Sequence, residues 1–400
     1  MYCGRMASEW LTTAEAAEAL GVKPETLYAY VSRGLLGRER TPGGRTSRYR
    51  RDDVERLAGR QRSGGRSGGL EIIVETALTL LEPEGRLSYR GWDVRDAAET
   101  STFEEVATWL WTGARGAEPF TAPDDLVRRV RKLGPALGPA PVDRIRASLA
   151  AVRSFDPLRH DRRPEAVAAH GRAIVALAIE ALAPVGEPAP GESVAARLWP
   201  RLSARPPTRR DIALLDATLV LLADHELAAS TLAARVAAST WADPYLVVLA
   251  GLAALGGPLH GGASERARAL LVEVRDGRSA AAAVDARLAE GELIPGFGHR
   301  VYTTLDPRAE VLLHRLLSGR SATTRAAHDI VAVMDERRLP FPNVDTGLAL
   351  LAEAYDMVPS AGAIVFAVAR IAGWLAHAVE EYEFRLRFRP RAAYVGPRPT

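Results

Sequence analysis

Over most of the chain, apolar residues recur with the spacing of an amphipathic helix, and polar residues occupy the positions between them. Six segments rich in Ala, Leu and Arg carry this period: 103–113, 167–182, 211–239, 244–255, 309–318 and 361–380. Strand patterns are scarce, and the short pieces 70–74 and 87–89, with the turn residues 83–85 between them, are predicted to form a hairpin. The Pro- and Gly-rich stretch 184–209 predicts a long loop. The pattern therefore predicts a mainly all-α fold class.

The first 60 residues have a pattern of their own. Thr12 stands three residues before Glu15, the spacing of a capping box, so a helix is expected to begin there and to end at Gly21. A second helix is expected from about Pro24, because proline is tolerated in the first turn of a helix. The segment is thus predicted to contain two short helices joined by a turn.

A change of composition marks a boundary after this segment. Residues 61–69 are rich in Gly, Ser and Arg without an apolar period, which is typical of a flexible linker. We therefore expect a small domain over 1–60, the linker, and a second domain over 70–400. Residues 1–69 contain 13 Lys and Arg against 8 Asp and Glu, whereas the whole chain has a net charge of only +3. This local excess of positive charge favours a polyanionic partner.

Composition also indicates a compartment. The chain of 400 residues has no uninterrupted run of about 18 apolar residues, and its N-terminus lacks the apolar core of a signal peptide. The single cysteine, Cys3, has no partner for an internal disulfide. These features predict a cytoplasmic protein that does not bind a membrane.

Four turn-rich segments interrupt the helical pattern, and each carries a polar side chain: 224–231, 256–263, 295–308 and 342–347. Pro and Gly break helices, so a His or Asp beside them lies at the end of an element. Loops held by a rigid scaffold are where catalytic groups concentrate. The sequence shows no metal-ligand spacing and no glycine signature of a nucleotide cofactor, so we expect neither a metal nor a cofactor.

Residues 70–400 resemble the citrate synthase family through an ordered series: His225, His260, His299, Arg308, Asp345, Arg370 and Arg389. The opening GLEIIVETALTLLEPEGRLSYRGWDV and the closing RPRAAYVGP are also similar to those of bacterial members. The resemblance implies a large and a small helical domain, the small one over about 262–355, and a homodimer. It also implies an enzyme that condenses an acyl-CoA with oxaloacetate, with the acyl-CoA as a substrate.

Such a condensation needs a base for a weakly acidic C–H group and a donor for the oxygen that becomes negative. By the resemblance, Asp345 is the base and His260 donates to the thioester oxygen. His299 polarises the keto oxygen of oxaloacetate and protonates the new alkoxide. Taken alone, each of these residues also fits a structural role beside a turn. The ordered series is what favours catalysis.

The resemblance assigns oxaloacetate binding to four residues: His225, Arg308, Arg370 and Arg389. Guanidinium groups match planar carboxylates with two parallel hydrogen bonds. In the family the last of these arginines reaches into the partner subunit's site. Of the 52 basic residues 50 are arginine, so any one of these arginines alone also fits a surface role.

A glycine-rich loop lines the adenine pocket of CoA in the family, and the matching residues here are Pro295, Gly296, Phe297 and Gly298. Four residues after His299 the family usually has a Lys or Arg suited to a CoA phosphate. This chain has Thr303 there, and Arg300 is expected to compensate. Acetyl-CoA is favoured as donor, and propionyl-CoA, which gives 2-methylcitrate, is the alternative because one methylene changes binding by only about 1–3 kcal/mol.

Residues 10–58 resemble the winged helix-turn-helix domains of MerR-type regulators and excisionases. A hairpin would form the wing, with four arginines against DNA phosphates: Arg45, Arg48, Arg50 and Arg51. Tyr28 stands where such domains commonly carry an arginine of the second helix. Protein or dimer contacts explain the domain equally well. A further alternative is a DNA-binding regulator whose synthase-like body senses a metabolite.

Overall fold

The computed structural model describes residues 10–20, 27, 31, 36–40, 47–54, 73–257 and 261–390. The chain divides into two compact units, Met1–Glu75 and Thr76–Thr400, and each has its own hydrophobic core. Several of the predictions lie outside the described residues: the linker 61–69 and the residues Cys3, Gly21, Pro24, Tyr28, Arg45 and His260.

The described part of the first unit contains β1 (Trp10–Thr12), α1 (Thr13–Ala19), β2 (Arg38–Arg40) and β3 (Ser47–Arg50). The strands form an antiparallel sheet in the order β1–β3–β2. Thr12 caps α1, since its hydroxyl accepts from the Glu15 N–H at 3.3 Å while the Glu15 carboxylate accepts from the Thr12 N–H at 2.8 Å. The predicted capping box is confirmed.

The second predicted helix of this unit is described only at Leu27 and Val31, which are both helical. Leu27, Tyr49 and Val54 are fully buried in the core of the unit. Strands β2 and β3 pair with Glu39 opposite Arg48, so they supply the two strands of the predicted wing.

The second unit opens with the antiparallel strands β4 (Thr79–Glu82), β5 (Arg86–Tyr89) and β6 (Trp92–Asp93). A hairpin is present, but the partner predicted for residues 87–89 was wrong, because 79–82 pair with them instead of 70–74. The turn 83–85 is only three residues long, so the first strand has to end directly before it. Gly85 adopts the left-handed φ of +94° that the turn requires.

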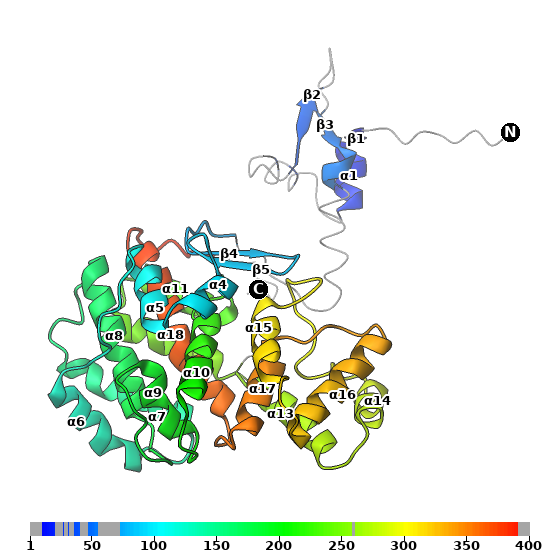
Figure 1. Cartoon of the computed structure of the whole chain (residues 1–400). Coiled ribbons are helices and arrows are strands. Elements are labelled where there is room, and N and C mark those ends of the chain that lie inside the picture. Colours follow the sequence, from blue (N-terminus) through cyan, green and yellow to red (C-terminus); the bar gives the residue numbers. More distant parts are fainter. Residues whose placement is uncertain are drawn as a thin grey trace, which may run out of the picture. The chain divides into compact units, whose positions relative to one another are not determined.

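The rest of this unit is helical, which confirms the predicted fold class (Figure 1). Its helices are α4 (Val94–Thr100), α5 (Phe103–Thr112), α6 (Asp124–Leu133), α7 (Pro141–Val152), α8 (Pro164–Glu180), α9 (Val194–Leu202), α10 (Arg209–Leu222), α11 (Ala229–Ser239), α12 (Pro244–Leu255), α13 (Ala263–Arg275), α14 (Ala280–Ala289), α15 (Pro307–Leu316), α16 (Ala322–Glu336), α17 (Val344–Ala354) and α18 (Ala361–Glu381), with the 3-10 helices η1 (Gly134–Ala136) and η2 (Arg153–Phe155). The predicted segment 211–239 is divided between α10 and α11.

The prediction of a long loop over 184–209 was wrong in part, because α9 lies within it. The Ser193 hydroxyl caps this helix by accepting from the Ala196 N–H at 3.2 Å. Leu198 and Trp199 are buried in the core. Their burial outweighs Pro200, which stands in the last turn of the helix.

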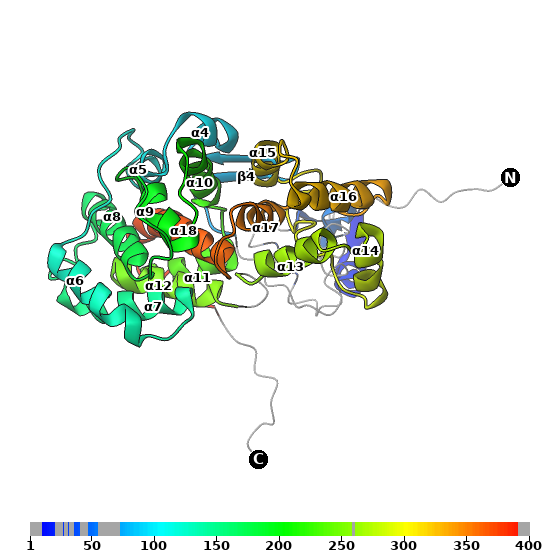
Figure 2. The same cartoon turned by 60° about the horizontal axis from the view of Figure 1, so that its bottom comes forward.

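Helix α18 forms the centre of the larger helical body, and α5, α8, α10, α11 and α12 pack against it (Figures 1 and 2). By length and composition alone α18 is apolar enough to cross a membrane, with a mean hydropathy of 1.6, but 83% of that stretch is buried inside the protein. Its burial accounts for its composition. In a second body, α13, α15 and α16 pack against α17, which also contacts α18 (Figure 2).

Candidate active site

The loop between α10 and α11 carries Asp224 and His225, and both side chains are buried. His225 Nε2 lies 3.2 Å from the hydroxyl of Tyr302. The rings of His225 and His299 meet edge to face with their centroids 5.1 Å apart, and those of His299 and Tyr302 are 4.5 Å apart. Two histidines that are far apart in the sequence therefore lie together, beside a tyrosine that was not predicted.

Asp224 fixes the loop of His225 through buried hydrogen bonds. Its carboxylate accepts from the Thr79 hydroxyl at 2.5 Å, from the Glu226 N–H at 3.1 Å and from His377 Nε2 at 3.2 Å. Burial alone would raise the pKa of Asp224, but the groups around it, His377 and Thr79 among them, hold that pKa below its usual value. A fixed negative charge therefore lies directly behind His225.

His377 extends this network through α18. Its Nδ1 accepts from Arg235 Nη1 at 2.7 Å, so the ring proton is on Nε2 and faces Asp224. Arg235 also pairs with Glu380 at 2.8 Å, and that carboxylate accepts from the Thr76 hydroxyl at 2.9 Å. The network therefore joins α11, α18 and the segment before β4 to the loop of the site.

Arg308, in the first turn of α15, is almost completely buried. Asp306 caps this helix and binds the guanidinium through Nε at 3.0 Å and Nη2 at 2.8 Å. The same carboxylate accepts from the Val344 N–H at 3.0 Å, at the start of α17. Burial would raise the pKa of Asp306, but Arg308 holds it below its usual value. The ion pair thus fixes the starts of two helices against each other.

His299 lies in the loop before α15. Its Nδ1 accepts from the N–H groups of Val301 at 3.0 Å and Tyr302 at 3.1 Å, so its proton is on Nε2. Burial, together with the charge of Arg308, lowers the pKa of His299 to about 4. At neutral pH His299 is therefore an uncharged hydrogen-bond donor through Nε2.

Asp345 lies in the first turn of α17, two residues after Asn343, which caps the helix. Asn343 Oδ1 accepts from the Asp345 N–H at 2.9 Å, and its Nδ2 donates to the Gly298 carbonyl at 2.8 Å. Burial raises the pKa of Asp345 to about 6, while Arg308 opposes the rise and Asp306 adds to it. This carboxylate is ionised at pH 7 and is a stronger base than an ordinary one.

The predicted CoA loop 295–298 is held against the same turn of α17. The Gly296 carbonyl accepts from the Asn343 N–H at 2.8 Å and from the Thr346 hydroxyl at 2.6 Å. Gly296 and Gly298 adopt left-handed φ values of +85° and +77°. A side chain at position 296 would also clash with the Thr346 hydroxyl, so this position requires glycine.

Arg370 is fully buried in the middle of α18. Its Nε donates to the Leu222 carbonyl at 2.8 Å, and its guanidinium lies 4.5 Å from the ring centre of Phe366. In the described part of the protein Nη1 and Nη2 have no hydrogen-bond partner. Burial lowers the pKa of Arg370 to about 10 while Asp224 opposes the fall, so the side chain is charged at neutral pH. Two unpaired nitrogens on a buried cation suit an anionic ligand.

The other predicted ligand-binding arginines of this unit, Arg300 and Arg389, are exposed to solvent. Arg389 Nη1 donates only weakly, to the Pro390 carbonyl at 3.4 Å. Within the described residues neither side chain bonds to the cluster around His299, so their roles stay predictions. The role of His260 also stays a prediction because this residue lies outside the described range.

In the first unit, the described arginines of the predicted wing differ in exposure. Arg50 is exposed and Arg51 is half-buried. Arg48 pairs with Glu39 at 3.5 Å, and its guanidinium lies 5.6 Å from the ring centre of Trp10. Part of the positive charge of Arg48 is therefore neutralised within the sheet.

The cluster contains four side chains that were not predicted: Asp224, Tyr302, Asp306 and His377. Asp306 stands directly before a proline, and this pattern of a helix N-cap could have identified it. His377 lies seven residues after Arg370, which places both on the same face of one helix. No sequence pattern marks Tyr302.

Among the described residues of this unit, two histidine–carboxylate pairs are buried. His377 pairs with Asp224, and His170 lies 3.3 Å from Asp156. Each pair orients one imidazole ring. Over the described ranges, no group of three or more His, Cys, Asp or Glu side chains is arranged to hold a metal ion.

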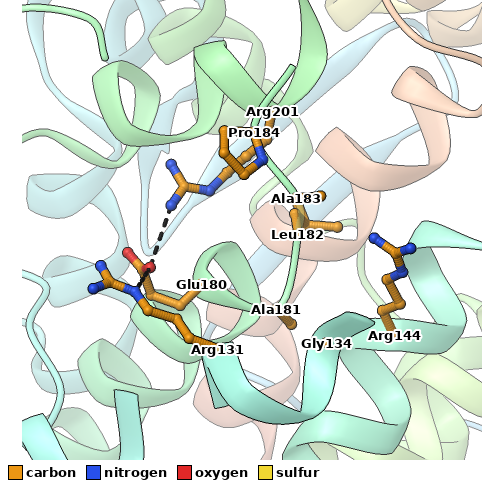
Figure 3. Close-up of a pocket in the computed structure, with 9 residues that line it drawn as sticks. All are labelled: Arg131, Gly134, Arg144, Glu180, Ala181, Leu182, Ala183, Pro184 and Arg201. Atoms are coloured by element: carbon orange, nitrogen blue, oxygen red, sulfur yellow. Dashed lines mark hydrogen bonds and ion pairs between the residues drawn. The ribbon is translucent and has the colours of Figure 1, made fainter. Parts of the chain in front are cut away.

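A cavity of about 830 Å³ opens beside Gly298 and His299, against α16. Another cavity, of about 590 Å³, lies between α6, α7, α8 and α9 (Figure 3). In that cavity Glu180 is paired with Arg131 and Arg201, and no predicted site residue lines it. Of these two cavities, the first is the one lined by predicted site residues, Gly298 and His299.

Comparison with known proteins agrees with this arrangement. Residues 69–391 match the citrate synthase C-terminal domain, and residues 10–62 match a helix-turn-helix domain. The chain is 33% identical to citrate synthase of Saccharolobus solfataricus, over 83% of this chain and 96% of that protein. It is 30% identical to citrate synthase 2 of Bacillus subtilis, over 82% of this chain and 95% of that protein.

Solved structures are similar over a comparable share of the chain. Citrate synthase from Thermotoga maritima superposes with a TM-score of 0.66 at 29% identity, over 84% of this chain and 97% of that one. The ternary complex of the Thermoplasma acidophilum enzyme with carboxymethyl coenzyme A and oxaloacetate superposes with a TM-score of 0.68 at 28% identity, over the same shares of 84% and 97%.

Proposed function

This chain belongs to the citrate synthase family and is an enzyme of the citrate synthase type, and we propose that it condenses acetyl-CoA with oxaloacetate and water to give citrate and CoA. The observation that carries the proposal is a cluster of two half-buried groups, the Asp345 carboxylate with its raised pKa and the neutral imidazole donor His299, with two buried arginines, Arg308 and Arg370. The Thermoplasma acidophilum synthase was solved with a CoA derivative and oxaloacetate, which supports the same two substrate classes here.

Oxaloacetate carries two carboxylates and one keto oxygen. In the proposed complex, Nη1 and Nη2 of Arg370 bind one carboxylate of oxaloacetate, since neither nitrogen has a hydrogen-bond partner among the described residues. Arg308 contributes to binding the second carboxylate, and Arg389 of the partner subunit completes the oxaloacetate pocket in a homodimer. The keto oxygen accepts from Nε2 of His299, and His225 binds the substrate from the side of Tyr302.

The reaction begins when Asp345 removes a proton from the thioester methyl group. His260 donates to the thioester oxygen as negative charge develops there. This hydrogen bond stabilises that charge, so that a carboxylate can remove a proton from the weakly acidic methyl group. The enol carbon then attacks the keto carbon, and the proton of His299 Nε2 passes to the new alkoxide. Water finally hydrolyses the thioester of the adduct and releases free CoA thiol and citrate.

The test is release of free thiol from acetyl-CoA by the purified chain in the presence of oxaloacetate, with citrate identified by mass spectrometry. Omitting oxaloacetate should abolish the release, and Asp345→Asn is the matched inactive control. No thiol from either acetyl-CoA or propionyl-CoA would refute the proposal. Oxaloacetate binding without turnover would instead favour a metabolite-sensing body.

We propose acetyl-CoA as the preferred donor. One extra methylene changes transition-state binding by about 1–3 kcal/mol, so the two donors should differ in kcat/KM by about 10- to 200-fold at most. Side-by-side measurement with acetyl-CoA and propionyl-CoA decides the point. A higher kcat/KM with propionyl-CoA would make the product 2-methylcitrate.

For the first unit we propose DNA binding as an added property. The supporting observation is the β2–β3 hairpin, with the exposed Arg50 at the end of β3. Such a wing binds phosphates without reading bases. A gel-shift assay at low salt tests this, and its failure would favour a protein-binding domain.

A further inference from the structure

We infer that Trp241 is a positioning residue for oxaloacetate binding, because it holds the chain segment that carries Arg389. The inference rests on the proposed function, in which Arg389 reaches the oxaloacetate pocket of the partner subunit. Trp241 lies in the turn between α11 and α12, and Arg389 lies in the segment 382–390 that follows α18. The two residues are far apart in the sequence, so the link between them runs through contacts in space.

Two hydrogen bonds to backbone carbonyls bind the start of the segment 382–390 to the end of α11 and the turn after it. The Tyr382 hydroxyl donates to the Ala242 carbonyl at 2.7 Å. The Leu386 N–H donates to the Ser239 carbonyl at 2.9 Å. The course of the chain after α18 is therefore fixed as far as Leu386.

Trp241 joins the same two parts of the chain through its side chain. Its Nε1 donates to the Phe384 carbonyl at 2.9 Å. The guanidinium of Arg385 lies 4.3 Å from the centre of the indole ring, and that of Arg162, in the loop before α8, lies 4.6 Å from it. A cation within about 6 Å of an indole ring is attracted by its π electrons. Trp241 thus binds the segment through its ring as well as through its N–H.

The backbone of Trp241 supports a role for this side chain. Its φ is +61°, in the left-handed region that residues other than glycine rarely adopt. Such a conformation persists only where the surrounding structure holds it. A smaller residue would suit this turn better, so the contacts of the indole account for a tryptophan at this position.

The distance from these contacts to Arg389 is short. Arg389 follows Leu386 by three residues, so even a fully extended chain places it no more than about 11 Å from the bound residue. Among the described residues the Arg389 side chain bonds only to the Pro390 carbonyl, at 3.4 Å. Its guanidinium is therefore available to a ligand while its backbone is confined. Such confinement lowers the entropy that is lost when Arg389 binds a carboxylate.

The segment also contacts the network behind His225 of its own subunit. Arg387 lies 3.9 Å from the Glu381 carboxylate, which pairs with Arg235 at 3.0 Å. Loss of Trp241 can therefore be transmitted to the site of either subunit, and the experiment has to separate the two.

The first measurement is steady-state kinetics. Trp241→Ala should raise the KM for oxaloacetate about tenfold and change kcat by less than about twofold, because only the positioning of a binding group is lost. Trp241→Phe keeps a ring for Arg385 but lacks the N–H, so a rise of about threefold is expected. Phe155→Ala is the matched control and should leave this KM unchanged, because Phe155 is also a ring beside an arginine, Arg129, at 3.7 Å.

The second measurement uses Arg389→Ala as the background. This variant alone should raise the KM for oxaloacetate at least as much as Trp241→Ala does. If Trp241 acts only through Arg389, the double variant should have the same KM as Arg389→Ala. A further tenfold rise in the double variant would overturn the inference.

The third measurement uses mixed dimers, obtained by expressing Trp241→Ala and Arg370→Met subunits together with different affinity tags. One site of such a dimer keeps Arg370, and the segment that enters it comes from the subunit that keeps Trp241. That site should have the KM for oxaloacetate of the unmodified protein. If Trp241 acted within its own subunit, neither site would be intact, and no activity with that KM would appear.

Melting temperatures show whether Trp241→Ala is folded, and Trp241→Phe replaces it in all three measurements if it is not. An unchanged KM for oxaloacetate in the folded variant would refute the role of Trp241. Failure of the unmodified chain to release thiol would instead refute the proposed function.

Discussion

Nε2 of His377 donates to Oδ2 of Asp224 at 3.2 Å, and both side chains are completely buried. The direction of this bond is determined on the other side of the ring, where Arg235 donates to Nδ1. The three side chains therefore act together, and His225 depends on them because it follows Asp224 in the chain.

Replacing His377 by alanine should leave Asp224 and Arg235 buried without one partner each. We expect a loss of about 3 kcal/mol in the free energy of unfolding and a roughly tenfold higher KM for oxaloacetate. Denaturant unfolding and steady-state kinetics measure the two effects. His170→Ala removes another buried histidine and should lower stability alone, so a rise of the oxaloacetate KM in both variants would argue against a specific link to His225.

The rate should depend on pH through Asp345. Because its pKa is raised to about 6 and the base has to be ionised, kcat/KM for acetyl-CoA should fall tenfold per pH unit below about pH 6. His299, with its pKa lowered to about 4, does not titrate in this range. If kcat/KM stays constant from neutral pH down to pH 5, the base is a carboxylate whose pKa is not raised.

The Asp345 carboxyl should also make the stability of the folded protein depend on pH, with a sign opposite to that of most acidic residues. Its pKa is higher in the folded protein than the reference value of 3.8, so folding binds the proton and stability falls as pH rises from about 4 to 6. Asp345→Asn cannot lose a proton, so its melting temperature should exceed that of the parent above pH 6 and equal it near pH 4. Its kcat should fall by at least about 100-fold. Equal melting temperatures at pH 8 would contradict this account.

Arg370 should show a trade-off between binding and stability. Its Nη1 and Nη2 have no hydrogen-bond partner in the part of the chain that the structure describes, so Arg370→Met should melt no lower than the parent while the KM for oxaloacetate rises about 100-fold. Oxaloacetate should raise the melting temperature of the parent but not of the variant. Arg235→Met is the control, and it should be strongly destabilised because that guanidinium is paired with Glu380. Thermal protection of Arg370→Met by oxaloacetate would show that the ligand binds elsewhere.

Binding of DNA by the first unit should be weak and dependent on salt. Replacing Arg45, Arg48 and Arg50 together by alanine should flatten the salt dependence, since each phosphate contact contributes a slope of about 0.9. Glu39→Gln should strengthen binding, because it releases Arg48 from its ion pair. Fluorescence anisotropy at several salt concentrations measures both, and an unchanged slope in the triple variant would favour protein binding.

Prediction from the sequence succeeded where the local spacing of residues, or the resemblance to a family, was enough to identify an element or a site residue. The capping box at Thr12 and the helices around Arg370 follow from spacing alone, and the resemblance identified histidines that the fold brings together. The strand that pairs with 87–89 was not identified, because the short turn 83–85 determines which residues form it, whereas the prediction relied on the apolar residues of 70–74. Helix α9 was missed because burial of Trp199 overrides the prolines around it.

The parts of the site that could not be predicted are those that depend on tertiary contacts. The raised pKa of Asp345 and the lowered pKa of His299 both come from burial, which no sequence window shows. The pairing of His377 with Asp224 links residues more than 150 positions apart. Such contacts become visible only once the helices are packed.

The Glu380 carboxylate accepts from the N–H of Ala77 at 2.8 Å and from the hydroxyl of Thr76 at 2.9 Å, so the second unit binds its own first residues. Both of these bonds join residues of the same unit, Thr76–Thr400. In evolutionary language this is a point of fusion. A gene encoding the second unit can gain, exchange or lose a module upstream of Thr76 while both bonds of this anchor are kept.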